Sequence, residues 1–212
     1  YKTSSRFTSG YKWLNVSVGY KYLKDVMEWT KYIYPGKEFA YNTSLNFDHK
    51  QLLYASVHVS PKFGIFRPTW GFNYNQQFFD TKKYGSSKAL SKPLLSCSIN
   101  NSFALSETMN AAIRLNASTT HAEGFLMMKS DYSVNLQFDK SFANRTWIIY
   151  LSANDIFKTA KERWTMYGLG AGTTKDCYNY TRCISLQVTY NFNAKRSKYK
   201  GTGAGNEEKS RL

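Results

Sequence analysis

Two segments of the sequence alternate apolar and polar side chains without interruption. Residues 132–139 read YSVNLQFD, and residues 184–192 read ISLQVTYNF. Because successive side chains of a β-strand point to opposite faces, each segment predicts a strand with one apolar and one polar face. The polar positions hold Ser, Asn, Gln, Thr and Asp. Small polar residues suit the wall of a water-filled lumen, and an aliphatic and aromatic outer face suits lipid.

The remaining sequence contains no run of about 18 apolar residues, which excludes a transmembrane helix. The mean hydropathy of −0.52 is typical of a soluble protein. However, strands of a transmembrane barrel are apolar only at every second position, so a window average hides them. Tyr, Trp and Phe make up 17% of the chain, which favours strands and aromatic girdles at membrane surfaces.

The pattern predicts eight strands, at residues 11–33, 38–60, 64–79, 94–105, 109–120, 125–139, 145–157 and 182–192. Short links at 61–63, 106–108 and 140–144 alternate with longer links at 80–93, 121–124 and 158–181. This alternation is typical of an up-and-down barrel in an outer membrane. The predicted fold class is therefore all-β, an antiparallel transmembrane β-barrel, whose first two strands project past the membrane.

An open sheet edge in hydrocarbon leaves backbone groups unpaired, each at a cost of several kcal/mol. The strands must therefore close on themselves as a small barrel or belong to a larger barrel with further strands. Residues 1–192 form the barrel part in this interpretation. Residues 193–212 are basic and rich in Gly, and we expect a flexible periplasmic tail.

The net charge of +15 raises nucleic acid, an anionic membrane surface or an acidic ligand as partners. The basic residues are spread over the predicted loops and the tail, and no predicted helix collects them on one side, so we expect no nucleic-acid partner. Loop lysines such as Lys82, Lys83 and Lys88 are instead candidates to contact the phosphates of lipopolysaccharide in the outer-membrane lipid.

No pattern of catalytic or metal-binding residues stands out, so we expect no enzyme activity, no cofactor and no metal site. His49, His58 and His121 lie far apart without partners at metal-ligand spacing. Cys177 and Cys183 are candidates for a disulfide, but two unpaired thiols fit the sequence equally well. The glycines of residues 168–172 lack a phosphate-loop spacing and predict an outer loop.

The aromatic residues supply the candidate site residues. They can form girdles at the lipid boundary or stack on sugars. For the girdles we predict five residues: Tyr20, Tyr22, Trp70, Phe78 and Trp147. In the long link at 158–181, Trp164 and Tyr167 are the candidates for ligand contact.

Several short motifs together resemble the carboxy-terminal barrel region of Bacteroidota TonB-dependent outer-membrane receptors, which are outer membrane β-barrel proteins. They are SPKFG at 60–64 with Arg67 and Pro68, QFF at 77–79, NDIF at 154–157 followed by residues 163–168, and NAKRSKYKGTGAG at 193–205. The resemblance covers nearly the whole chain. Its most specific part is the KYKGTGAG tail, which follows a strand ending in Tyr190 and Phe192.

The resemblance implies a barrel of about 22 strands, of which this chain supplies about the last eight. It also implies an upstream plug that engages an energy-coupling TonB-type protein, assembly machinery that reads the terminal strand with Tyr190 and Phe192, and sometimes a surface lipoprotein. The implied function is uptake of a nutrient, which could be a glycan, a siderophore or a peptide. Two alternatives stay open: a complete eight-stranded barrel acting as an anchor or adhesin, and a soluble β-sandwich that binds carbohydrate.

Overall fold

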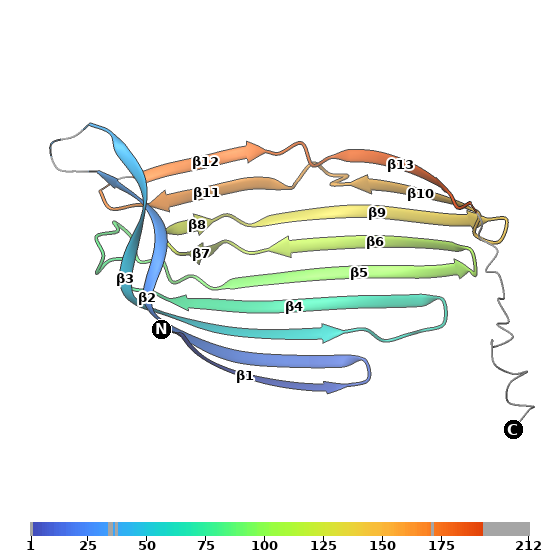
Figure 1. The fold of residues 1–212 in the computed structure, drawn as a ribbon, viewed down its shortest axis with the longest axis horizontal. Helices are drawn as coiled ribbons and strands as arrows, with labels where there is room; N and C mark the ends of the chain where they lie inside the picture. Colours follow the sequence, from blue (N-terminus) through green and yellow to red (C-terminus); the bar gives the residue numbers. More distant parts are fainter. Residues whose placement is uncertain (1, 34–35, 37, 171, 193–212) are drawn as a thin grey trace, which may run out of the picture.

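The computed structural model describes residues 2–33, 36, 38–170 and 172–192, and these residues form two antiparallel sheets (Figure 1). The large sheet has nine strands, in the order β1 (Lys2–Tyr11), β2 (Leu14–Ile33), β3 (Ala40–Val59), β4 (Phe66–Phe78), β5 (Leu94–Ser106), β6 (Met109–Ser118), β9 (Asp131–Phe142), β10 (Trp147–Asn154) and β13 (Cys183–Tyr190). The small sheet has four strands, in the order β12 (Gly172–Tyr178), β11 (Lys161–Tyr167), β8 (Leu126–Met128) and β7 (His121–Glu123). Among these residues there is no helix of the length and apolar character needed to cross a bilayer.

The small sheet continues four strands of the large one. β7 follows β6, β8 precedes β9, β11 follows β10 and β12 precedes β13, so the two sheets lie end to end (Figure 1). The chain therefore runs back and forth as nine long strands, four of which are interrupted. The all-β antiparallel prediction is confirmed, but the predicted count of eight strands is too low.

Several predicted boundaries are wrong. The predicted link at 121–124 contains β7, and the predicted strand at 125–139 is divided into β8 and β9. β1 precedes the first predicted strand, and only Phe7 and Tyr11 give it a weak apolar pattern. The predicted long link at 158–181 contains β11 and β12, which form a hairpin. By contrast, the long link between β4 and β5 is irregular, as predicted.

The strand register determines which side chains share a face of the large sheet. Residues directly opposite each other on antiparallel strands point to the same side. One row therefore joins apolar side chains across six neighbouring strands: Val16, Val57, Phe72, Cys97, Ala117 and Tyr132. The neighbouring row on the opposite face joins polar ones: Ser17, Ser56, Asn73, Ser96, Ser118 and Asp131. The predicted division into an apolar and a polar face thus extends across the large sheet.

The apolar face of the large sheet is exposed. Val18, Phe72, Leu136, Leu151 and Leu186 all count among its exposed large hydrophobic residues. Within the described residues no second sheet is stacked on this face, because the small sheet continues the large one instead. This arrangement differs from a soluble β-sandwich, which hides its apolar residues between two sheets.

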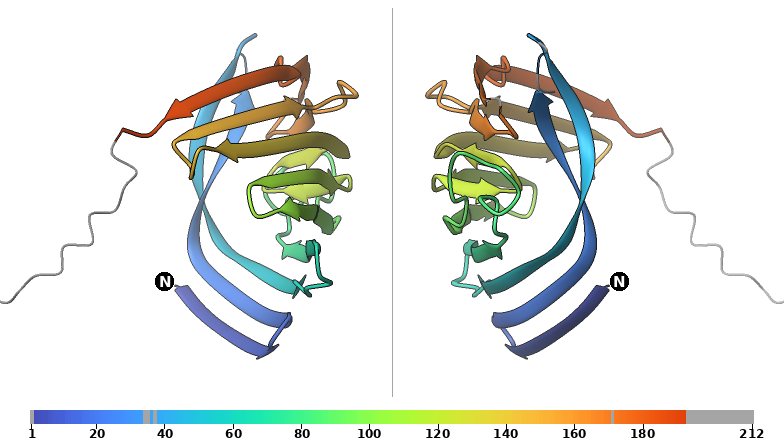
Figure 2. Two further views of the ribbon diagram at one scale, coloured as in Figure 1. Left: turned by 90° about the vertical axis from the view of Figure 1, so that its right-hand side faces the viewer. Right: turned by 90° about the vertical axis from the view of Figure 1, so that its left-hand side faces the viewer.

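The large sheet is curved but open. β1 pairs only with β2, and β13 pairs only with β10, so each has one edge without a strand partner among the described residues. Figure 2 shows these two edges lying apart on the same side of the molecule. A closed barrel is therefore not formed by the described residues alone.

The two ends of the large sheet differ. Four short connections lie at one end, which we call the short-turn end: residues 12–13, 60–65, 107–108 and 143–146. At the opposite, long-loop end lie the small sheet, the irregular loop 79–93 and the far half of the β2–β3 hairpin (Figure 1). These three parts pack together, and we call them the cap.

The tail at 193–212 lies outside the described residues, so the prediction of a flexible periplasmic end stays a prediction.

Candidate functional site

The cap is attached to the polar face of the large sheet through Gln77, which lies near the end of β4 and is only 4% exposed. Its side-chain amide forms two hydrogen bonds with Gly124 in the β7–β8 turn. The Gly124 N–H donates to Gln77 Oε1 at 2.8 Å, and Gln77 Nε2 donates to the Gly124 carbonyl at 3.2 Å. Gln77 Nε2 also donates to the carbonyl of Leu90 at 2.7 Å. One buried side chain therefore satisfies backbone groups of both the loop and the turn, which would be costly to bury unpaired.

The cap contains the apolar core of the described residues. Its centre is a group of three aromatic rings, Phe47 from β3, Phe79 from the loop and Phe125 from the β7–β8 turn, with centroids 5.2 to 5.4 Å apart. Four further buried residues complete this core: Leu90, Ala122, Met127 and Met166. Residues from four separate segments meet here, so the loop 79–93 has a defined place against the small sheet.

The interruption between β10 and β11 is organised by Asp155, which is 1% exposed and has a φ of 46°. Its Oδ1 accepts hydrogen bonds from the N–H groups of Thr159 and Ala160, at 2.8 and 3.2 Å. Its Oδ2 accepts one from the Thr181 hydroxyl, at 2.7 Å, next to the start of β13. Burial raises the pKa of Asp155, but these hydrogen bonds outweigh it and leave the pKa below its ordinary value. Asp155 thus stabilises the irregular segments between β10 and β11 and between β12 and β13.

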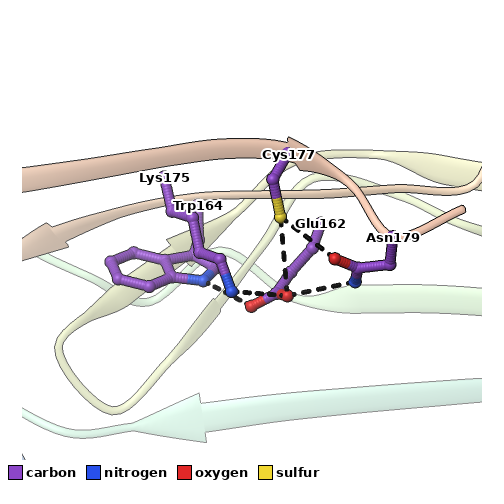
Figure 3. A network of polar contacts seen from close by, with 5 residues as sticks. All are labelled: Glu162, Trp164, Lys175, Cys177 and Asn179. Atoms are coloured by element: carbon purple, nitrogen blue, oxygen red, sulfur yellow. Dashed lines mark hydrogen bonds and ion pairs between the residues drawn. The ribbon is translucent and has the colours of Figure 1, made fainter.

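The β11–β12 hairpin carries a polar network around Glu162 (Figure 3). The ammonium of Lys175 lies 2.7 Å from Oε2, and the indole N–H of Trp164 donates to Oε1 at 3.0 Å. Asn179 Nδ2 donates to Oε2 at 3.2 Å. Lys175, Trp164 and Asn179 lower the pKa of Glu162 to about 2. The carboxylate therefore keeps its charge at neutral and mildly acidic pH and fixes the two strands to each other.

Both candidate disulfide cysteines have free thiols. Cys177 donates to Asn179 Oδ1 at 3.2 Å, and Cys183 accepts a hydrogen bond from Asn154 at 3.4 Å. Of the two alternatives left open by the sequence, the structure has the unpaired thiols.

The tip of the β2–β3 hairpin reaches across the long-loop end to the β11–β12 turn. Leu169 N–H donates to the carbonyl of Lys31 at 2.8 Å, and Ile33 N–H donates to the carbonyl of Leu169 at 3.2 Å. The Lys31 ammonium also donates to the Thr173 hydroxyl at 2.6 Å. Figures 1 and 2 show the hairpin crossing the end of the large sheet. The cap thus connects strands from both halves of the chain.

Two arginines of the polar face have neither a counter-ion nor a side-chain hydrogen bond within the described residues. Arg67 on β4 and Arg114 on β6 line a pocket of about 230 Å³ with Asn100 and Gln137, and neither guanidinium has an ion pair or a hydrogen bond within the described residues. Asn100 Oδ1 is buried without a donor from that same part of the chain. The same pocket contains the carboxylate of Asp139, whose Oδ2 accepts a hydrogen bond from Asn110 Nδ2 at 2.8 Å. The pocket therefore offers two unpaired guanidinium groups, one unpaired acceptor and one carboxylate.

The predicted girdle residues share one face. The register places Tyr20, Tyr22, Trp70, Phe78 and Trp147 with the apolar side chains of the large sheet. Trp70 and Trp147 lie toward the short-turn end, and the other three lie toward the long-loop end. From Trp70 to Phe78 the strand extends about 26 Å, at about 3.3 Å per residue, and a tilt of about 40° turns this into a rise of about 20 Å, somewhat less than an apolar band of about 25 Å. The arrangement is consistent with two girdles, and the girdle role itself stays a prediction.

Trp164 and Tyr167 are not in an irregular loop, as the sequence suggested, but in β11. Both pack against the apolar core of the cap, and the Lys88 ammonium lies 5.3 Å from the Tyr167 ring centre. Ligand contact by these residues stays a prediction. The terminal-strand residues Tyr190 and Phe192 lie in edge-to-face contact at 4.5 Å beside Trp147.

Sequence reasoning missed the polar residues that organise the cap. Gln77, Asp155 and Glu162 follow no recognisable spacing, although Gln77 lies in the QFF motif and Asp155 in the NDIF motif. Within the described part of the chain, no three His, Cys, Asp or Glu side chains are grouped to hold a metal ion.

The comparisons with known proteins agree with this geometry. Residues 2–190 match the model of the family described as outer membrane protein beta-barrel family. Neither the curated proteins nor the solved structures gave a match. The matched region includes every strand of both sheets, with the exposed apolar face that such a barrel turns toward lipid. The chain therefore belongs to the outer membrane protein beta-barrel family and is located in the outer membrane.

Proposed function

We propose that this chain forms part of the wall and the extracellular end of a TonB-dependent outer-membrane receptor that takes up a nutrient. The nutrient is a glycan, a siderophore or a peptide. The apolar face of the large sheet contacts lipid, and the polar face lines the lumen. The cap lies on the extracellular side, because the short turns of such barrels are periplasmic.

The direction of the two edge strands carries this proposal. Nine strands in antiparallel order make β1 and β13 run the same way, both toward the short-turn end. Closing the sheet on itself would therefore place them side by side in parallel. Bacterial single-chain barrels have an even number of antiparallel strands. An antiparallel closure thus needs an odd number of further strands, which disfavours a complete small barrel.

A barrel of about 22 strands meets this condition, because about 13 strands would come from elsewhere in the protein. The two unpaired arginines of the polar face support a lumen that holds a plug or a solute. Arg67 and Arg114 lie with the buried Asn100 oxygen on the wall that a plug or a passing solute would contact. A plug would also provide the connection to the energy-coupling protein.

A cysteine cross-linking scan of the full-length protein in its membrane tests the closure. One cysteine is placed in β1 and one in β13, in a background where Cys97, Cys177 and Cys183 are replaced by Ser. We expect no disulfide from any pair, because other strands lie between the two edges. As a positive control, the neighbours Val16→Cys and Ser9→Cys, which lie opposite each other on β2 and β1, should cross-link.

Efficient cross-linking of β1 to β13 would contradict the proposal and favour a small barrel that acts as an anchor or adhesin. A second measurement separates a receptor from an open pore. The full-length protein in a planar bilayer should show little conductance, because a plug fills the lumen. A large conductance from the intact protein would count against a plugged receptor.

Three partners follow from this proposal. They are an energy-coupling TonB-type protein, the barrel assembly machinery at the terminal strand, and a surface lipoprotein over the cap. Lipopolysaccharide is a fourth, through lysines of the cap. Lys83 already pairs with Asp48 at 2.8 Å, so Lys82→Gln should weaken lipopolysaccharide binding at least as much as Lys83→Gln. Unchanged binding when Lys82, Lys83 and Lys88 are all neutralised would rule this partner out.

A further inference from the structure

A pocket of about 630 Å³ lies between two connections at the short-turn end of the large sheet. It is formed by the β1–β2 turn and the β3–β4 link, which are joined by a hydrogen bond from the Ser60 N–H to the Trp13 carbonyl at 2.7 Å. Its lining combines three large aromatic residues with two lysines: Trp13, Phe63 and Trp70 with Lys12 and Lys62, beside Val59, Ser60 and Pro61. Of these residues only Trp70 has a role above, as a predicted girdle residue, and no ligand has been assigned to the pocket.

The pocket opens on the lipid-facing side. Val59 and Trp70 are opposite each other in the register and belong to the apolar face. The Trp70 ring is held in place because its N–H donates to Asn101 Oδ1 at 3.0 Å. Trp13 and Phe63 are 46% and 60% exposed, so their rings are available to a ligand.

The two lysines have no anionic partner. Neither Lys12 nor Lys62 takes part in any ion pair within the described residues, and the Lys12 ammonium lies 5.8 Å from the centre of the Tyr11 ring. Both belong to connections that leave the apolar band, where lysine ammonium groups meet the headgroup region while their stems cover apolar surface. Two free cations therefore lie beside a hollow with aromatic walls.

We propose that this pocket binds an anionic glycerophospholipid of the periplasmic leaflet. Lys12 and Lys62 bind the phosphate, and Trp13, Phe63 and Trp70 contact the glycerol and the first carbons of the acyl chains. This order of chemistry, from cation to aromatic ring to aliphatic side chain, matches the order of groups along a phospholipid. The proposal rests on the outer-membrane location and not on the transport function.

Charge and position argue against two other occupants. A second copy of the chain packed face to face here would bring four lysines together, and like charges in contact are unfavourable. Lipopolysaccharide would have to contact the other end of the sheet, beside the cap. The lysines at that end serve as a matched control.

The test uses native mass spectrometry of the full-length protein in detergent micelles, with phosphatidylglycerol and phosphatidylcholine of identical acyl chains. We expect phosphatidylglycerol to bind more tightly. The Lys12→Gln/Lys62→Gln double variant should bind it about 30-fold more weakly, since each lysine near an anionic lipid contributes about 1 kcal/mol. The control variant Lys82→Gln/Lys161→Gln, which removes the same charge at the cap, should bind it as the wild type does.

Rescue distinguishes a phosphate site from a structural effect of the two substitutions. Lys12→Arg/Lys62→Arg should restore most of the affinity, because arginine keeps the charge. Trp13→Leu should weaken both lipids equally, because it removes contact area but no charge. Circular dichroism of each variant should show the same β content.

Three results of the lipid titration would overturn the proposal. They are equal affinity for the two lipids, unchanged affinity in the Lys12→Gln/Lys62→Gln variant, or an equal loss in the control variant. A dimer that dissociates when the two lysines are replaced would also overturn it, because it would assign the pocket to a second copy.

Discussion

The large sheet and the cap differ in the burial of their apolar side chains. On the large sheet, apolar residues such as Leu186 are 67% exposed, whereas Phe125 in the cap is 1% exposed. The large sheet spans the membrane, so lipid covers its apolar face and no protein core is needed. The cap buries its own apolar residues, as a part that lies in water has to do. The contrast is what we expect of one chain that is stabilised by lipid in one region and by a protein core in the other.

The polar residues follow the same division. On the large sheet they line one face in rows of Ser, Asn and Gln. In the cap, buried polar groups are single residues with several partners each, such as Gln77 and Asp155. A buried polar group without partners is costly. We therefore expect the effect of a substitution on stability to depend on the hydrogen bonds it removes in the cap, and on which face it lies on in the large sheet.

The largest expected effect is in the core of the cap. Phe125→Ala should destabilise the cap by about 3–5 kcal/mol, because it leaves a cavity among Phe47, Phe79 and Met166. Hydrogen exchange of the full-length protein should show faster exchange in the β7–β8 and β11–β12 hairpins. The matched change Phe72→Ala on the lipid face should have a much smaller effect, since lipid fills the space. Equal effects would mean that the two regions do not differ in solvent.

The next effect concerns the two faces of β9. Leu136→Arg should destabilise the protein in a bilayer by about 2–4 kcal/mol, the cost of a cation near the middle of the lipid face. Gln137→Arg should have a mild effect, because that side chain faces the lumen. Unfolding in lipid vesicles with urea measures both. A large effect of Gln137→Arg with a small effect of Leu136→Arg would reverse the assigned faces.

A smaller effect is expected where the two regions meet. Asp155→Asn should cost about 1–3 kcal/mol in local stability, because it removes a charge that accepts several hydrogen bonds. Hydrogen exchange at Thr159 and Ala160 should rise, while the exposed Asp176→Asn control leaves it unchanged. Because the pKa of Asp155 is lowered in the folded protein, its contribution is complete above the ordinary pKa and is lost as the pH falls through the lowered value. An Asp155→Asn variant with wild-type exchange would remove Asp155 from this role.

The smallest effect is at the surface of the cap. The pKa of Glu162 is lowered to about 2, so its attraction for Lys175 is complete above about pH 4.5 and is lost as the pH falls through about 2. The wild-type β11–β12 hairpin should therefore exchange faster at pH 2 than at pH 5, after correction for intrinsic exchange. The Glu162→Gln variant should lack this dependence. An identical pH profile in both proteins would show that the pair has no role.

Much of the large sheet could be predicted from the sequence. Lipid imposes a strict alternation, and segments such as Tyr132 to Phe138 repeat it without a miss. The same rule fails for β1, because it has only two large apolar residues. It also failed for β11 and β12, although the Gly-containing turn between them is a hairpin signal that could have identified them.

The cap could not be predicted because its contacts are distant in the sequence. Gln77 and Gly124 are 47 residues apart, and Phe47 and Phe125 belong to different hairpins. Neither pair has a characteristic spacing, since the contacts depend on where the loop 79–93 packs. The free thiols were also beyond prediction, because the sequence fits paired and unpaired cysteines equally well.

The central claim is that hydrocarbon covers the apolar face of the large sheet. An accessibility scan along β9 tests it most directly. Single spin labels at positions 133 to 138, in a background without the natural cysteines, are exposed in a bilayer to oxygen, which concentrates in lipid, and to a water-soluble nickel chelate. We predict an alternation, with high oxygen accessibility at Val134, Leu136 and Phe138 and high chelate accessibility at Ser133, Asn135 and Gln137. Uniform accessibility to either reagent, or oxygen accessibility at the polar positions, would contradict the account.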